Sequence, residues 1–320
     1  MDMKQKNIIN HRIINLAHTF LLFGGMVLLL ALLGWSLAGT SGLVWASVLG
    51  GFFVYLSARA PSQLILRMSG ARPLAGQEAP GLNKVIRELS RRAGLSAVPR
   101  LYYLPNSMLN ALTVNGQDAA AIALTDGLIR QLDGRELTGV LAHEISHLRQ
   151  KDLRVLQFAG AIARITNLFA FLGQILLFVN IPLVLMGQSP ISWFTILILL
   201  AAPTLSGLLQ MALSRTREFE ADLGAVRLTG DPEGLARALE KMARVQQSFF
   251  RRFLWPEHIT TKSSPLSTHP ATGERVARLR SLTDVQPRPP ILDPGETVPG
   301  HAYQPWQNLL ATRRFFRFHL

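Results

Sequence analysis

Residues 143–147 read His-Glu-Ile-Ser-His. Side chains at positions i and i+4 lie on the same face of a helix, so His143 and His147 can reach one metal ion. Glu144 then lies next to the ion, where its carboxylate can take a proton from an attacking water. Although the five-residue pattern is only moderately specific by itself, it predicts metal-dependent hydrolysis with Glu144 as general base.

A catalytic zinc ion usually has three protein ligands and one open position. The segment 217–222, Arg-Glu-Phe-Glu-Ala-Asp, contains the best candidate for the third ligand. Glu218 and Asp222 share a helical face, which favours Glu218 on the metal and Asp222 hydrogen-bonded to a ligand imidazole. An acidic surface turn is the alternative interpretation. Two His, one Glu and a water suit one Zn²⁺ ion per chain best.

The composition indicates a membrane protein. Charged residues make up 17% of the 320 residues, against roughly 25% in soluble proteins, and the mean hydropathy is +0.23. The net charge of +13 is consistent with nucleic acid, anionic lipid or a positive-inside bias. The absence of Cys excludes disulfides, thiolate metal sites and Cys nucleophiles.

Four apolar stretches are candidates for membrane spans, and they cover residues 14–37, 43–56, 165–186 and 191–213. Their short links lack Lys and Arg and predict two hairpins, whereas the other flanks are basic. The positive-inside rule therefore predicts that both termini and all large polar segments are cytoplasmic. A buried helical pair of a soluble core is the alternative for the second hairpin, but such helices rarely run so long without charge.

The predicted fold class is a mostly α membrane protein with four transmembrane helices in two hairpins and a cytoplasmic α+β, zincin-like catalytic domain. The predicted domains are a hairpin (1–59), a first catalytic part (60–155), a second hairpin (156–213), a second catalytic part (214–283) and a Pro-rich tail (284–320). Helices are expected over 81–93, 133–149 and 231–245, and strands over 100–104, 110–114 and 120–124.

The motif at 143–147 and the segment 214–222, separated by a transmembrane hairpin, together resemble the HtpX-type membrane zinc peptidases, which are related to the CAAX prenyl endopeptidases. The resemblance covers roughly residues 60–280. It implies that Glu218 is the third ligand and that Asp152 supports the site, because Asp152 follows His147 at the family's spacing. It also implies that His269, in a late His-Pro motif, lies near the reaction centre.

The resemblance extends to Asn110-Ala111-Leu112, which matches a segment on the strand that edges the family's cleft. An extended substrate could pair with Asn110, Ala111, Leu112 and Val114 by strand addition, and broad specificity would follow. Leu112 replaces the family's aromatic residue, which changes a substrate pocket rather than the chemistry. An ordinary sheet edge is the alternative here, as a surface residue is for His269, whose expected role is to stabilise an oxyanion.

The sequence therefore predicts a zinc metalloendopeptidase of the bacterial inner membrane, multi-pass, with a cytoplasmic active site. The expected substrates are misfolded or unassembled membrane proteins, so the role is quality control under stress. The bilayer and other membrane quality-control proteases are the further partners, and nucleic acid is not expected. The competing hypotheses are an inactive membrane scaffold and a transporter; the predicted spans contain almost no ionisable residues for a transport pathway.

Overall fold

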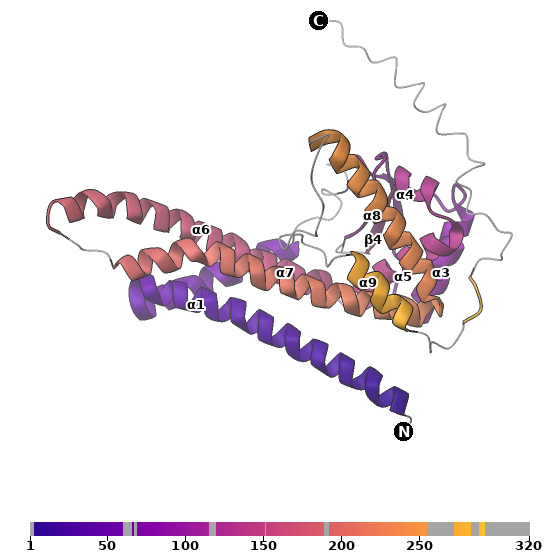
Figure 1. The fold of residues 1–320 in the computed structure, drawn as a ribbon, viewed down its shortest axis with the longest axis horizontal. Coiled ribbons are helices and arrows are strands. Elements are labelled where there is room, and N and C mark those ends of the chain that lie inside the picture. The colour runs from indigo at the N-terminus through magenta and orange to yellow at the C-terminus, as the bar shows by residue number, and fades with distance from the viewer. Residues whose placement is uncertain are drawn as a thin grey trace, which may run out of the picture. The chain divides into compact units, whose positions relative to one another are not determined.

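The computed structural model describes residues 3–59, 66, 69–114, 120–150, 152–188, 192–254, 272–282 and 288–291. Two compact units divide the chain, with boundaries after Pro61, Arg149 and Ala221. The first unit holds the long apolar helices, and the second holds the sheet and the shorter helices (Figure 1). The described part of the chain is mostly helical, with one small mixed sheet.

The first unit contains α1 (Met3–Arg59), α6 (Asp152–Leu185) and α7 (Trp193–Thr229), although α7 continues into the second unit. Three stretches are long and apolar enough to cross a membrane: Ala17–Phe53, Val155–Leu185 and Trp193–Thr229. A core that includes Leu33, Ile165 and Leu199 packs the three helices together. Large apolar side chains such as Phe178 are exposed on the outside, as expected of a surface that faces lipid.

Helix α1 is interrupted at Ala38 and Gly39, where the backbone is not helical. Gly39 has a positive φ of 56°, a conformation that glycine adopts readily. Gly34 and Gly42 approach so closely that a Cβ on either would collide with the other's backbone. In a continuous helix, eight residues would separate them by about 12 Å. The chain therefore reverses direction here, at the link that the sequence predicts between the first two apolar stretches.

The second unit contains a four-stranded sheet of order β1-β2-β4-β3. The strands are β1 (Arg72–Pro73), β2 (Arg100–Leu104), β3 (Ala111–Val114) and β4 (Ala121–Thr125). β2 and β4 are parallel, and β1 and β3 are antiparallel to their neighbours. Every residue of β4 is buried, because β4 lies in the middle of the sheet. β3 is an edge strand within the described sheet.

The helices of this unit are α3 (Pro80–Ala93), α4 (Asp126–Gln131), α5 (Gly134–Gln150), α8 (Pro232–Leu254) and α9 (Thr272–Ser281). Their apolar faces share one core with β2 and β4. The three helices and three strands that the sequence predicts are all present, and α8 runs farther than expected. The sequence prediction missed β1, α4 and α9.

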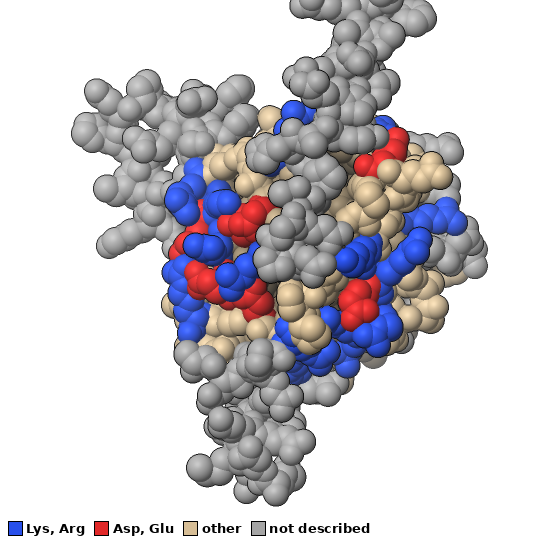
Figure 2. Space-filling view, turned by 90° about the vertical axis from the view of Figure 1, so that its right-hand side faces the viewer, with Lys and Arg blue, Asp and Glu red and all other residues tan. Residues whose placement is uncertain are grey.

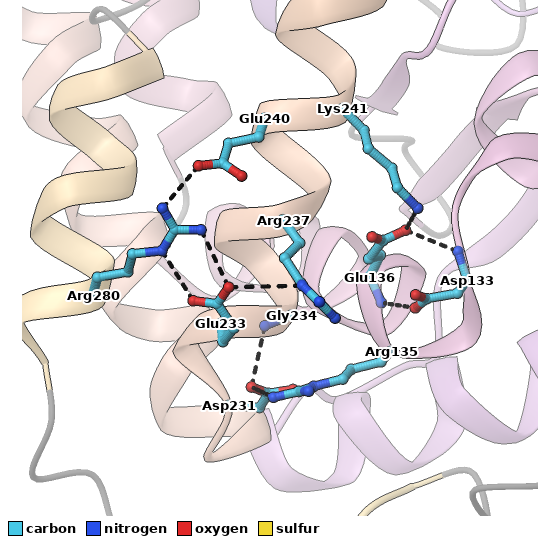
Figure 3. Close-up of polar contacts among 10 residues, drawn as sticks. All are labelled: Asp133, Arg135, Glu136, Asp231, Glu233, Gly234, Arg237, Glu240, Lys241 and Arg280. Carbon is cyan, nitrogen blue, oxygen red and sulfur yellow. Dashed lines mark hydrogen bonds and ion pairs between the residues drawn. The ribbon is translucent and has the colours of Figure 1, made fainter.

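Helix α5 is positioned by a capping box and by charged contacts with α8. Asp133 Oδ1 accepts a hydrogen bond from the Glu136 amide at 2.8 Å, and Glu136 Oε2 accepts one from the Asp133 amide at 3.0 Å. The buried Glu136 also pairs with Lys241 of α8 at 2.6 Å. Figure 3 shows this group, and Arg280 of α9 bonded to Glu233 and Glu240 of α8. The start of the helix that bears the His pair is therefore firmly held.

Candidate metal centre

His143 and His147 project from the same face of α5, one turn apart. Their Nε2 atoms are 3.1 Å apart, and His143 is only 8% exposed. Two imidazole nitrogens at this distance can both direct their lone pairs at one ion. Such a pair is well placed to bind a single cation.

Glu218 on α7 completes a group of three. Ligand atoms of His143, His147 and Glu218 all lie within 4.8 Å of one another. Two imidazoles and one carboxylate are the donor set of many catalytic zinc sites. The cluster can therefore hold a metal ion, and its donor atoms fit zinc.

Asp222 lies one helical turn after Glu218 and contacts the opposite side of the His143 ring. Its Oδ1 is 2.9 Å from His143 Nδ1. A carboxylate on Nδ1 fixes the tautomer in which Nδ1 carries the proton, so Nε2 keeps its lone pair for a metal. The sequence predicts this contact from the spacing of Glu218 and Asp222.

Arg275 of α9 holds Asp222 in place. Its guanidinium donates two hydrogen bonds to the carboxylate, from Nε at 2.8 Å and from a terminal nitrogen at 2.6 Å. Both side chains are buried. Bidentate pairing restrains the carboxylate in both position and rotation. The contact of Arg275 with Asp222 is not among the sequence predictions.

The carboxylate of Glu144 is held by a hydrogen bond from the sheet. Thr113 Oγ1 of β3 donates a short hydrogen bond to Glu144 Oε2. Thr113 is buried. The sequence predicts Ala111, Leu112 and Val114 of this strand as substrate-binding residues, and Thr113 is not among them. Alternation in the sequence does not mark Thr113, because Thr113 and Val114 are both buried in this strand, and the contact with Glu144 follows only from the fold.

Asp152 lies at the start of α6 and is fully buried. Its carboxylate pairs with Arg217 at 2.9 Å, the residue directly before Glu218. Gln150 donates to the Glu220 carbonyl at 3.2 Å. These two contacts bracket Glu218 along α7, so the backbone that bears this carboxylate is restrained on both sides.

The predicted substrate strand is regular and partly exposed. The Asn110 amide donates to Thr125 Oγ1 at 3.0 Å, and its carbonyl accepts from the Thr125 hydroxyl at 2.8 Å. Leu112 is 37% exposed, whereas Val114 is buried. Four predicted substrate-binding residues are close to one another only because they belong to β3 or directly precede it: Asn110, Ala111, Leu112 and Val114. His269 lies outside the described residues.

Comparison with known proteins decides the family. The sequence model of Peptidase family M48 matches residues 76–283, about two thirds of the chain. The chain belongs to peptidase family M48. It is therefore a metalloendopeptidase, and its long apolar helices make it an integral membrane protein of this family.

Individual relatives of this M48 peptidase agree with the assignment. It is 36% identical to Protease HtpX of Legionella pneumophila over 84% of this chain and 99% of that protein. It is 34% identical to a Protease HtpX homolog of Paraburkholderia phytofirmans, over 84% and 97% respectively. Among solved structures, it is similar to the crystal structure of S. mikatae Ste24p, with a TM-score of 0.48, 18% identity and coverage of 86% of this chain and 66% of that one.

Proposed function

We propose that this M48 peptidase uses one zinc ion, held by His143, His147 and Glu218, to cleave misfolded or unassembled membrane proteins at the cytoplasmic face of the bacterial inner membrane. The observation that carries the proposal is the group of three ligand side chains, with Glu144 next to His143 in the same helix. Zinc bound there would polarise the substrate carbonyl and lower the pKa of a water toward about 7.

Glu144 acts as general base and then as general acid. Its carboxylate takes the proton of the attacking water and later gives it to the leaving amine of the peptide. The hydrogen bond from Thr113 occupies one carboxylate oxygen, Oε2. The other oxygen, Oε1, is then the natural position for the proton in transit. Thr113 thus orients the base, as Asp222 orients His143.

Substrate binding is assigned to the edge strand β3 and the residue before it. An extended peptide that adds to the segment Asn110–Val114 would bond to the backbone groups that point away from β4, since the Asn110 amide and carbonyl are already bonded to Thr125. The exposed Leu112 would touch the peptide's side chains. Backbone pairing supports broad sequence tolerance, which suits substrates that share only the unfolded state. His269 is proposed to stabilise the oxyanion that forms at the scissile carbonyl.

Membrane proteins are proposed as substrates because the site is built on helices that continue into candidate spans. Helix α5 ends at Gln150, and α6 begins at Asp152, shortly before the apolar stretch Val155–Leu185. Glu218 lies in α7, which itself begins as a candidate span. Basic residues lie on the flanks away from the two short links, which supports a cytoplasmic site and four spans.

The test measures metal-dependent proteolysis by the full chain. The protein is purified in neutral detergent under chelation, zinc is added, and cleavage of labelled casein is followed. Glu144→Gln should bind zinc normally but lose at least about 100-fold in kcat, the usual contribution of a general base. Glu240→Gln, which removes a partly exposed carboxylate of α8 that pairs with Arg280, is the matched control and should cleave normally.

If wild type and Glu144→Gln both bind zinc and neither cleaves, the peptidase proposal fails, and an inactive membrane scaffold replaces it. Cleavage that continues without metal, or at an unchanged rate in Glu144→Gln, would contradict the roles assigned to the ion and to Glu144.

A further inference from the structure

Helix α3 has an apolar face and a basic face. Leu82, Val85, Ile86 and Leu89 are buried in the core of the second unit. The outer positions follow the spacing of one helical face and carry five charged side chains: Lys84, Arg87, Glu88, Arg91 and Arg92. Figure 2 shows groups of Lys and Arg side chains, with Asp and Glu between them, on the side of the molecule where Figure 1 labels α3.

This basic face borders a cavity of about 650 Å³. Lys84, Arg87, Arg91 and Arg92 all line it, and Pro290 and Ile291 line it from a distant part of the sequence. The site is an open hollow, and the second segment that lines it distinguishes it from the face of a single solvated helix. The volume falls in the range of small-molecule sites. None of the residues assigned to the metal centre lines the cavity.

Arg92 holds the second wall in place. Its side chain is 7% exposed and pairs with Glu88 at 2.7 Å. Its two terminal nitrogens donate to the Leu228 carbonyl at 2.9 Å and to the Pro289 carbonyl at 3.1 Å. The residue next to Pro290 is thereby fixed to α3. The cavity is therefore built by specific hydrogen bonds within the second unit.

The charge of the lining is strongly positive. Four cations face one carboxylate, so the lining has an excess of three positive charges. Glu88 bonds to both Arg91 and Arg92, and these bonds lower its pKa to about 2. Glu88 is therefore ionised at neutral pH and offsets only part of the field from its two partners. Lys84 and Arg87 are exposed and add their charge at the same cavity.

We propose that this cavity binds a phosphate-bearing ligand, either a free phosphate compound or the phosphate of a lipid headgroup. A phosphate with two negative charges and three or four oxygens can engage Lys84 and the Arg87 guanidinium at once, the latter through paired hydrogen bonds. Arg91 and Arg92, which are bonded to Glu88, add their positive charge to the lining. A single carboxylate of a peptide brings one charge and two oxygens, which leaves most of the lining unmatched. The concave shape also suits a compact headgroup better than an extended chain.

The experiment titrates the zinc-loaded full chain in neutral detergent at about 0.15 M salt, where the Debye length is about 8 Å. One arm uses inorganic phosphate and the other dihexanoyl phosphatidic acid, and both are followed by phosphorus NMR line broadening. Saturable binding of phosphate supports a free anion as ligand. Binding of phosphatidic acid alone supports a lipid headgroup.

The decisive variant is Lys84→Glu with Arg87→Glu, which reverses two cations of the cavity and leaves Arg92 in place. Its Kd should rise at least about tenfold, since two charge-assisted contacts are lost. The matched control reverses two exposed cations that do not line the cavity, Arg100→Glu with Arg244→Glu. At this salt concentration its Kd should stay within about threefold of wild type. Unchanged zinc content and melting temperature verify that both variants are folded.

In the two phosphate arms, three results would overturn the proposal. They are no saturable binding in either arm, an equal loss of affinity in the control, and binding that persists in the Lys84/Arg87 variant, which would locate the anion at the metal or elsewhere. A third arm uses an acidic hexapeptide. Tighter binding of the peptide than of either phosphate compound, abolished in the same variant, would replace the phosphate ligand with an acidic protein segment.

Discussion

At the scale of single residues, the geometry of the general base depends on one hydroxyl. Thr113→Val keeps the shape of the side chain but removes the donor to Glu144 Oε2. A lost hydrogen bond to a charged group costs about 1.5–3 kcal/mol, so kcat should fall roughly tenfold or more, with KM and zinc affinity little changed. Thr113→Ser retains the hydroxyl and should recover most of the activity. Equal rates for the Val and Ser variants would show that Thr113 only fills space.

Glu88 predicts a specific acid dependence of stability. Hydrogen bonds from Arg91 and Arg92 lower its pKa from 4.5 to about 2. The folded protein binds this proton less readily than the unfolded chain, so the stabilisation is fully present above pH 4.5 and is lost as the pH falls toward 2. In metal-free protein, the unfolding midpoint of Glu88→Gln should therefore change less between pH 4.5 and 2 than that of wild type. If the unfolding midpoints of the two proteins fall equally between pH 4.5 and pH 2, the assigned pKa is contradicted.

The side chains of the candidate metal site could be identified from the sequence, whereas several of their supporting contacts could not. His143, His147 and Asp222 follow from local helical spacing, because positions i and i+4 meet on every helix. The partners of Glu144 and Asp222 come from residues 31 and 53 positions away in the chain. Such pairings depend on the tertiary fold, and a single sequence contains no periodic signal for them.

At the scale of elements, the packing of α5 against α8 requires a glycine. A Cβ at Gly139 would lie 2.8 Å from the Leu235 amide nitrogen and 2.9 Å from its Cα, so backbone would have to move. Gly139→Ala should destabilise the protein by about 1–3 kcal/mol as an overpacked contact, less any gain in helix propensity. Differential scanning fluorimetry measures the change in melting temperature.

Gly273→Ala is the control for that substitution. Gly273 lies in α9, where a Cβ would meet nothing within 4 Å. Its melting temperature should be unchanged or slightly raised, because alanine favours the helix. If both variants lose the same stability, close helix packing is not the cause, and the contact between α5 and α8 is looser than the structure indicates.

The elements that escaped prediction are short or lack a pattern. β1 has two residues and α4 has six, so each extends over fewer than two periods of strand alternation or helical repeat. The order of the strands in the sheet could not be predicted from the sequence either. Its parallel pair β2 and β4 are not consecutive strands, because the chain passes through β3 between them. The longer helices α3 and α5 were predicted almost to the residue, since caps and amphipathic spacing mark their ends.

At the scale of the whole molecule, the number of spans depends on α1. As one continuous helix, the 37 residues of Ala17–Phe53 would extend about 55 Å, well beyond the 30 Å of the hydrocarbon core. The reversal at Ala38 and Gly39 divides this length into residues 17–37, about 32 Å long, and residues 40–53, about 21 Å long, and the second arm reaches about 30 Å only when the helix is counted to Arg59. If both arms cross the bilayer, residues 1–12 lie on the same side of the membrane as Arg59, where α1 ends. A single crossing would place them on the opposite side.

Because the chain contains no Cys, single cysteines can report this topology without background. With four spans and a cytoplasmic site, a membrane-impermeant maleimide added to intact cells should label Thr40→Cys and Gln188→Cys, which lie at the two turns. Gln5→Cys and Ser281→Cys should react only after the cells are opened. Labelling of Gln5→Cys from outside, together with a protected Thr40→Cys, would instead show that α1 crosses once. Labelling of Ser281→Cys from outside would place the α9 side of the protease away from the cytoplasm and exclude cytoplasmic substrates, although the hydrolytic chemistry would remain possible.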